Sequence, residues 1–187
     1  MEITVKGTVL TDLVKIVRKE PQLAWNDYLK PEDWDIINSE ILATQWYPGD
    51  FFYRLSYAVF KVVAQSDLNV CFDFGKIAAH NLAQVYKFII VPGDPGASME
   101  RFLIRRKAFF GGAYSSAETG RIKNGHGWLS FLYTNANPEV KGSEVAGVIA
   151  HTVAGALYEL AGLTGGRNVS SKVAQKGDFF EIKIEWK

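Results

Sequence analysis

The stretch FFEIKIEWK, residues 179–187, decides the fold of this chain because it alternates between two kinds of side chain. One set is apolar and consists of Phe180, Ile182, Ile184 and Trp186. The set between them is charged and consists of Glu181, Lys183, Glu185 and Lys187. A period of two residues with one apolar face is typical of an antiparallel sheet that packs on helices with one face and meets water with the other.

Further strands are predicted before this one. Asn124-Gly125 separates two strand-like segments, residues 114–123 and 127–134, and predicts a hairpin with a type I′ turn. A helix from about Ser143 to Ala161 follows, and Lys176-Gly177-Asp178 joins two closing strands. The second half of the chain is therefore a hairpin, a helix and a second hairpin.

The first half is predicted to be helical. Apolar residues recur at helical spacing within residues 10–17, and Pro31 and Asp50 stand where two further helices begin. Asp73 is expected to cap a long helix whose buried row is Phe74, Ala78, Leu82, Val85 and Ile89. The predicted fold is α+β, with several N-terminal helices packed on a four-stranded antiparallel sheet made of two hairpins separated by a helix.

Composition favours one globular domain spanning residues 1–187. Hydrophobic residues make up 48% of the chain and charged residues 22%, a balance that excludes a disordered protein. The formal net charge is +1, so the whole molecule has no general attraction to nucleic acid or to an anionic membrane.

The sequence predicts a cytoplasmic protein without a membrane span. Cys71 is the single cysteine and has no partner for an internal disulfide, which favours a reducing compartment. Charges are scattered through residues 1–20, so no secretory signal is expected there. The apolar stretch Val145–Tyr158 is shorter than the about 20 residues that a bilayer requires and is interpreted as a buried helix.

The common catalytic signatures are missing from the sequence. It contains no Walker loop, no G-x-G-x-x-G after a strand, no G-x-S-x-G, no C-x-x-C and no H-E-x-x-H. The 3 histidines are far apart, which argues against a structural zinc site. No metal site is predicted.

His151 is the histidine of most interest. It lies in a row with Gly147 and Gly155 on one face of a very apolar helix, and the glycines would let another backbone approach closely. A satisfied core histidine, the lining of a ligand pocket and a contact to metal or haem are the readings left open. An enzyme would use His151 with Tyr158 or Glu159, although these residues do not share one helix face well.

A basic helix is the main electrostatic feature. Arg101, Arg105, Arg106 and Lys107 place four positive charges on two helical turns. They form either a solvated helix face or a binding site for a phosphate or an acidic partner.

Short motifs spread along the chain resemble a known family. Gly165-Gly166-Arg167-Asn168-Val169, Lys176-Gly177-Asp178 and Ile184-Glu185-Trp186 resemble the closing segment of four-vinyl-reductase-type small-molecule-binding domains. An uncharacterised bacterial family of stand-alone proteins is still more similar, with counterparts in order of Gly7, Trp46-Tyr47-Pro48, Gly75 and Tyr86. The superfamily also contains the haem–nitric oxide binding domains and Golgi-transport subunits, and it implies helices packed on an antiparallel sheet.

Departures from the resemblance predict a domain without a cofactor. The haem-binding branch has a proximal histidine on the helix before the first hairpin, whereas residues 94–110 contain none. Its Tyr-x-Ser-x-Arg clamp has no match, because the nearest string is Tyr133-Thr134-Asn135-Ala136-Asn137. Val173 and Glu181 stand where many vinyl-reductase-type domains have cysteines. We therefore expect no cofactor and consider haem unsuited to this chain.

The sequence thus predicts a non-enzymatic sensor or adaptor that holds a small apolar or lipid-like ligand between helices and sheet. His151, Gly147, Gly155 and Tyr86 are the candidate ligand-binding residues. The first alternative is a homodimeric protein-interaction scaffold without a ligand, and the second is an enzyme that uses His151.

Overall fold

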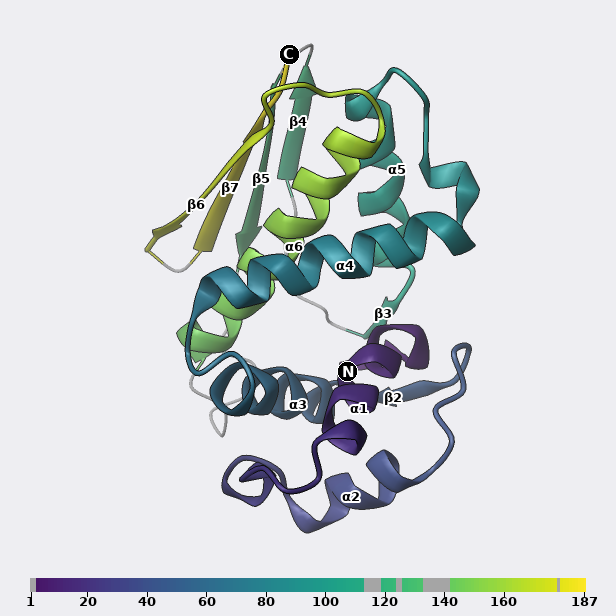
Figure 1. The fold of residues 1–187 in the computed structure, drawn as a ribbon, viewed down its shortest axis with the longest axis vertical. Coiled ribbons are helices and arrows are strands. Elements are labelled where there is room, and N and C mark those ends of the chain that lie inside the picture. Colours follow the sequence, from purple (N-terminus) through teal and green to yellow (C-terminus); the bar gives the residue numbers. More distant parts are fainter. Residues whose placement is uncertain (1–2, 113–118, 124–125, 133–141, 178) are drawn as a thin grey trace.

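The structure is a computed structural model, and it describes residues 3–112, 119–123, 126–132, 142–177 and 179–187. Its elements form two lobes that lie one above the other in Figure 1. The N-terminal lobe contains the elements β1 (Thr4–Lys6), α1 (Gly7–Lys19), η1 (Trp25–Asp27), α2 (Pro31–Asn38), β2 (Trp46–Pro48) and α3 (Gly49–Val62). The C-terminal lobe contains α4 (Leu68–Val85), η2 (Lys87–Ile89), α5 (Pro95–Lys107), β4 (Thr119–Lys123), β5 (His126–Leu132), α6 (Gly142–Leu163), β6 (Ser170–Lys176) and β7 (Phe179–Glu185). The short strand β3 (Phe110–Gly111) connects them.

The C-terminal lobe is built in layers on an antiparallel sheet. Its strands follow the order β4-β5-β7-β6, so the closing strand β7 is internal and pairs on both sides. Ile182 of β7 stands opposite Leu129 of β5 and Val173 of β6. Helix α6 covers one face of this sheet, and α4 lies across the outer side of α6 (Figure 1). The α+β class predicted from the sequence is confirmed.

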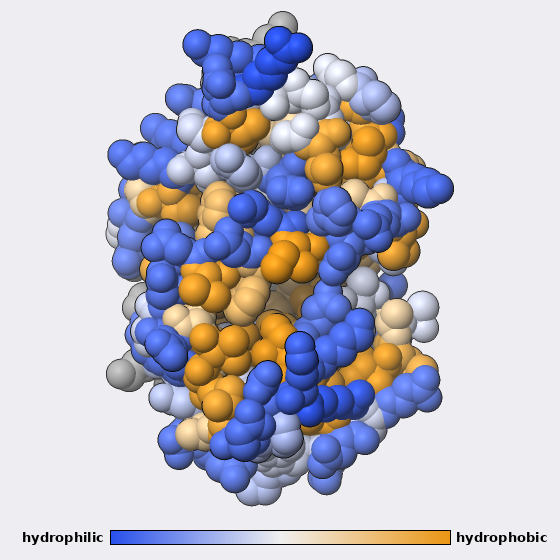
Figure 2. All heavy atoms as spheres, in the orientation of Figure 1, coloured by the Kyte–Doolittle hydropathy of each residue, from blue (hydrophilic) through white to orange (hydrophobic). Residues whose placement is uncertain are grey.

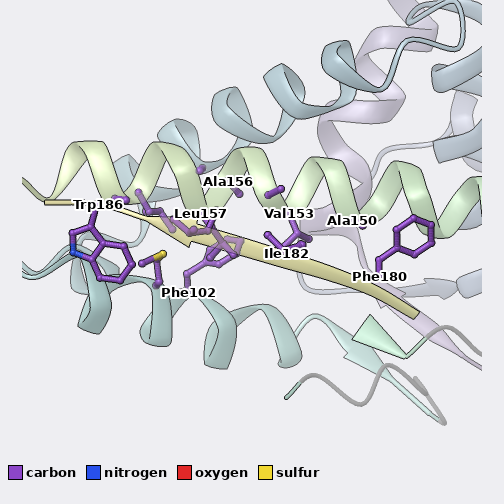
Figure 3. Close-up of a cluster of buried hydrophobic side chains, with 14 of the residues drawn as sticks. Phe102, Ala150, Val153, Ala156, Leu157, Phe180, Ile182 and Trp186 are labelled. Atoms are coloured by element: carbon purple, nitrogen blue, oxygen red, sulfur yellow. The ribbon is translucent and has the colours of Figure 1, made fainter. Parts of the chain in front are cut away.

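The alternation of the closing segment is confirmed in the core of this lobe. Phe180, Ile182, Ile184 and Trp186 are all buried. Figure 3 shows Phe180, Ile182 and Trp186 of this set in one cluster with side chains of α6 and with Phe102 of α5. The hairpin expected around Asn124-Gly125 is present as the β4–β5 pair, in which Lys123 stands opposite His126. Residues 124 and 125 themselves lie outside the described residues, as does the 114–118 segment.

Helices α4 and α6 meet backbone to backbone at two glycines. A Cβ atom added to Gly75 would lie 1.8 Å from the carbonyl oxygen of Thr152, and one added to Gly155 would lie 1.9 Å from that of Phe72. No side chain fits at such distances, so glycine is required for this close approach. The expectation that glycines in α6 allow close contact with another backbone is confirmed for Gly155.

The long helix α4 differs from its prediction in its start and in its buried face. It begins at Leu68, with the Asp67 side chain accepting a hydrogen bond from the Asn69 amide at 2.8 Å, and Asp73 lies inside it. Its fully buried residues are the small ones, Cys71, Gly75 and Ala79. Of the predicted row, Ile89 is buried as expected but lies beyond the helix, Phe74 and Leu82 are partly buried, and Ala78 and Val85 are exposed, Val85 by 73%.

A second sheet, not predicted from the sequence, organises the N-terminal lobe. Strand β1 pairs with β2 on one side and with β3 on the other, and Val5 stands opposite both Tyr47 and Phe110. Two- and three-residue strands have too few residues to show an alternating pattern, so they are invisible to periodicity arguments. Because β3 follows α5, this sheet fixes the end of α5 against the start of the chain.

The N-terminal lobe has its own apolar core and one buried ion pair. Val5, Leu10, Trp25, Ile37, Phe51 and Leu55 are among its buried residues. Pro31 begins α2 as expected, whereas α3 begins at Gly49 and Asp50 does not cap it. Asp33 of α2 is 1% exposed and receives two hydrogen bonds from Arg54 of α3, at 2.9 and 2.6 Å.

Helix α6 is longer than its apolar core predicted. It spans 22 residues, and by length and composition alone the part from Glu144 to Leu163 would be able to cross a membrane. Within the protein, 67% of its most apolar window is buried, between α4 and the sheet. Its hydropathy is thus explained by its central position in the fold.

Candidate functional site

A hollow in the surface separates α4 from the N-terminal helices. Figure 2 shows it near the centre of the molecule, bordered above and below by apolar side chains. Helix α4 leaves one large apolar side chain uncovered, since Ile77 is 58% exposed. A helix that leaves a large apolar side chain uncovered beside a hollow provides the kind of surface on which an apolar ligand binds.

Three apolar side chains from outside the N-terminal helices reach the core of the N-terminal lobe. These are Phe74 of α4, Phe110 of β3 and Ile149 of α6, and each is partly buried against the N-terminal cluster. Phe110 makes an edge-to-face contact with Phe52 of α3, with ring centroids 5.8 Å apart. We call Phe74, Phe110 and Ile149, together with Ile77, which follows Phe74 by three positions on α4, the interlobe site.

The lobes are also joined by a polar cluster at the start of α6. The Glu144 carboxylate accepts hydrogen bonds from the Tyr57 hydroxyl and from Lys61 Nζ, both of α3 and both at 2.8 Å. Burial, with the neighbouring Glu144, raises the pKa of Tyr57, and the hydrogen bond to Glu144 raises the pKa of Lys61. This cluster is a structural tie because each of its members is satisfied by another.

His151 is held by its own helix. Its Nδ1 lies 2.7 Å from the carbonyl oxygen of Gly147, and since a carbonyl only accepts, Nδ1 carries the proton. The residues considered as catalytic partners are engaged elsewhere. Glu159 faces His80 at 3.5 Å, and the Tyr158 ring packs edge-to-face on Phe72. The structure therefore brings no acid–base pair to His151 among the described residues.

The other candidate ligand-binding residues are dispersed. A Cβ at Gly147 would contact the Phe180 ring at 3.5 Å, so this position faces the sheet, whereas Gly155 is filled by the α4 backbone. Tyr86 follows α4 and contacts the rings of Phe88 and Phe109. Gly147 thus lies beside His151, Gly155 and Tyr86 have other neighbours, and the role of all four in ligand binding stays a prediction.

The four cationic side chains of helix α5 have different surroundings. Arg101 donates to the Phe88 carbonyl oxygen at 2.7 Å. Arg106 is buried, with its guanidinium carbon 4.9 Å from the centre of the Phe110 ring. Arg105 lies over the rings of Tyr86 and Phe109, and Lys107 is exposed at the helix end. The sequence showed the charges but not which of them face inward.

The described part of the chain offers no cluster for a metal ion. No three His, Cys, Asp or Glu side chains lie close enough there to hold one. Cys71 is buried, and burial raises the pKa of its thiol to about 11, so it is protonated and inert at neutral pH.

Solved structures with the same fold belong to the H-NOX domains. A point mutant of the T. tengcongensis H-NOX matches with a TM-score of 0.60 and 12% identity, over 97% of both chains. The Fe(II) unliganded H-NOX protein from K. algicida has a TM-score of 0.59 and 12% identity, over 97% of this chain and 96% of the other. An S. oneidensis H-NOX in the Fe(II)NO ligation state matches with a TM-score of 0.55 and 12% identity, over 97% and 99%. At these identities the likeness shows the fold.

Sequence comparisons add no family to this structural result. Neither the models of known protein families nor the curated proteins matched the sequence. The fold is therefore of the H-NOX (haem–nitric oxide binding) type, as the superfamily resemblance implied.

The prediction that this fold carries no cofactor is wrong. The proteins that share it include one studied for its haem distortion and one with NO bound to Fe(II), which points to haem. The missing histidine of residues 94–110 and the missing Tyr-x-Ser-x-Arg match, on which that prediction rested, do not decide whether this fold carries haem.

A haem beside α5 would need an axial ligand and open space next to the helix. The described helix has no histidine, and its buried soft donor is the thioether of Met99. Met99 belongs to the filled cluster that includes Phe102 and Trp186 (Figure 3). As packed here, these residues do not fit a haem beside α5, and we assign no step to haem iron.

Proposed function

We propose that this chain is a sensor domain that binds a small, largely apolar ligand at the interlobe site. The observation that carries this proposal is the hollow between α4 and the N-terminal helices, together with an α4 that leaves Ile77 58% exposed. A likeness over 97% of the chain to H-NOX domains, among them an NO-ligated one, supports small-ligand sensing as the class of function. The enzyme alternative is weaker, because His151 has no catalytic partner among the described residues.

The interlobe site suits a sensor because it lies between two separately packed cores. A ligand held there contacts Phe74, Phe110 and Ile149, which themselves bridge the two lobes. A ligand that binds one arrangement of the lobes better than another shifts the population toward it. The change in arrangement is what a cytoplasmic partner would detect.

We also propose that the chain is closer to the four-vinyl-reductase-type and stand-alone bacterial proteins than to other branches. The glycines of that resemblance have physical reasons here. A Cβ at Gly7 would lie 2.2 Å from the Leu42 carbonyl oxygen, and one at Gly166 would lie 2.7 Å from that of Ala161. Gly75 makes the helix contact already described, and Trp46-Tyr47-Pro48 forms β2.

The test uses ligand retention by the full chain and two matched variants. Ile77→Asp places a charge at the interlobe site, whereas Ile104→Asp places the same charge on the exposed face of α5. Each protein is incubated with hemin, followed by visible absorption, and separately with bacterial lipid extract, followed by native mass spectrometry. We expect wild type and Ile104→Asp to retain a ligand in one of these arms and Ile77→Asp to lose it.

The two arms also identify the ligand class. A Soret band in the hemin arm assigns the site to haem, and a bound mass in the lipid arm assigns it to a lipid-like molecule. Retention of nothing by wild type, or equal retention by Ile77→Asp, would contradict the proposed site. Circular dichroism of each variant shows whether it has folded.

A further inference from the structure

The surface formed by the end of α4, η2 and α5 combines exposed apolar side chains with arginines. Val85, Phe88 and Ile104 are 73, 54 and 72% exposed. The rings of Tyr86 and Phe88 are 6.0 Å apart, and Arg101 donates to the Phe88 carbonyl, so this segment is held against α5. We call Val85, Phe88, Ile104 and Arg105 the α5 surface.

Arg105 occupies an unusual position on this surface. Its guanidinium carbon lies 4.5 Å from the centre of the Tyr86 ring and 5.0 Å from that of Phe109. Its Nε atom is buried and has no hydrogen-bond partner among the described residues. In the same part of the chain, no carboxylate forms an ion pair with this side chain.

The neighbouring cations of α5 either contact other groups of the protein or are exposed to solvent. Arg101 is bonded to a backbone carbonyl, and Arg106 is turned inward over Phe110. Lys107 is exposed, and a lysine is a mobile point charge. Arg105 is therefore the cation of α5 that two rings orient while its Nε has no hydrogen-bond partner in the described part of the chain.

Stacking on rings orients a guanidinium without using its donors. The attraction to an aromatic ring acts through the ring face, whereas the N–H groups point outward in the guanidinium plane. Because Nε is covered, any open part of the group is its Nη end. That edge is suited to two parallel hydrogen bonds with one carboxylate.

We propose that the α5 surface docks a segment of a partner protein that presents a carboxylate beside apolar side chains, with Arg105 binding the carboxylate. A small molecule is a poor fit, because side chains exposed by more than half protrude and enclose nothing. Arginine and aromatic residues together are the composition of protein-interface hot spots. A lipid headgroup would gain little from an arginine held in one plane, since exposed lysines serve it equally well.

This inference goes beyond the ligand proposal and does not depend on it, since the two sites involve different residues. The interlobe site would receive the signal, and the α5 surface would present it to a partner. Loss of binding at one site leaves the other testable.

The experiment measures coupling between Arg105 and a carboxylate. The probe is a synthetic amphipathic peptide with glutamates along the edge of its apolar face, and its counterpart has glutamines at those positions. Both are titrated into wild type, Arg105→Gln, Arg105→Lys and the control Lys107→Gln, which loses the same charge from an exposed neighbour. Binding is followed in every protein by NMR on the methyl groups of Val85 and Ile104, and in wild type and Lys107→Gln also on the Arg105 side-chain N–H.

We expect the glutamate peptide to bind wild type and Lys107→Gln similarly and to bind Arg105→Gln about ten- to a hundredfold more weakly, as for a lost charge-assisted pair. Arg105→Lys should recover only part of the affinity. The glutamine peptide should bind wild type and Arg105→Gln equally, which a merely structural role of Arg105 would not produce.

Three results would overturn the proposal. The first is no binding of the glutamate peptide up to about 1 mM, the weak end of the affinity scale. The second is an equal loss in Arg105→Gln for both peptides. The third is adsorption of wild type to phosphatidylglycerol vesicles that weakens as much in Lys107→Gln as in Arg105→Gln, which would assign the surface to a membrane.

Discussion

At the scale of single residues, the pair of Asp33 and Arg54 shows how a buried charge is retained in the N-terminal lobe. The Asp33 carboxylate receives hydrogen bonds from the Lys30 amide at 2.9 Å and from two nitrogens of Arg54. The same hydrogen bonds with Asp33 raise the pKa of Arg54. The carboxylate therefore stabilises the start of α2 and joins α2 to α3.

We predict that Arg54→Ala lowers the free energy of unfolding by about 3–5 kcal/mol, because it leaves the Asp33 charge buried without its partner. Urea denaturation followed by circular dichroism measures the change. The control is Lys15→Ala, which removes the exposed i,i+3 partner of Asp12 and should cost less than about 1 kcal/mol. Equal effects of the two substitutions would show that the Asp33 pair contributes no more than a surface ion pair.

Cys71 leads to a prediction for the alkaline pH range. Burial, with a smaller contribution from the charge of Asp67, raises the pKa of its thiol from 9.0 to about 11. Between these values the unfolded chain releases the thiol proton and the folded chain keeps it, so stability falls as pH rises, by about 1.4 kcal/mol for each pH unit.

The urea midpoints of wild type and Cys71→Ala should therefore differ less near pH 11 than below pH 9.0. The thiol should also react with iodoacetamide mainly after unfolding. Rapid alkylation of the native protein, or parallel pH curves for the two proteins, would show that Cys71 is accessible.

At the scale of elements, α4 shows what a hydrophobic pattern can and cannot predict. The start and the buried face of this helix were predicted wrongly, because the prediction placed its apolar residues at helical spacing on the buried face. Its true contact face is made of Cys71, Gly75 and Ala79, because two helices approach this closely only through small side chains. A hydropathy scale cannot predict this face, because it ranks residues by polarity and not by size.

Gly155→Ala tests the close contact of α4 and α6. The new Cβ would overlap the Phe72 carbonyl oxygen and force the two backbones apart, so we expect a loss of about 1–3 kcal/mol or more in unfolding free energy. Gly162→Ala, in the same helix, is the matched control because nothing lies within 4 Å of its Cβ position, and it should be neutral or slightly stabilising. Equal and small effects in thermal melts would mean that the helices adjust without cost.

At the scale of the whole molecule, the sequence predicted the C-terminal lobe better than its relation to the N-terminal one. The closing strand and the hairpins have periods that a single segment reveals, and these elements are as expected. The interlobe site depends on Phe74, Phe110 and Ile149, which lie far apart in sequence and meet only through the packing of two cores. The basic charges of α5 were visible, but the rings that orient Arg105 come from another segment.

The tie between the lobes gives the last prediction. Glu144 of α6 accepts hydrogen bonds from Tyr57 and Lys61 of α3, so a single carboxylate joins a helix of each core. Glu144→Ala removes both bonds and should lower the free energy of unfolding by about 1–3 kcal/mol.

Because the tie lies between the two cores, losing it should also make the two lobes unfold less cooperatively. Fluorescence of the buried Trp25 and hydrogen exchange of β7 amides, which report on different lobes, should coincide in urea for wild type and separate in the variant. Lys76→Ala, which removes an ion pair within α4, should leave the two transitions together. Coincident transitions in Glu144→Ala would show that apolar contacts through Phe74, Phe110 and Ile149 couple the lobes without the polar tie.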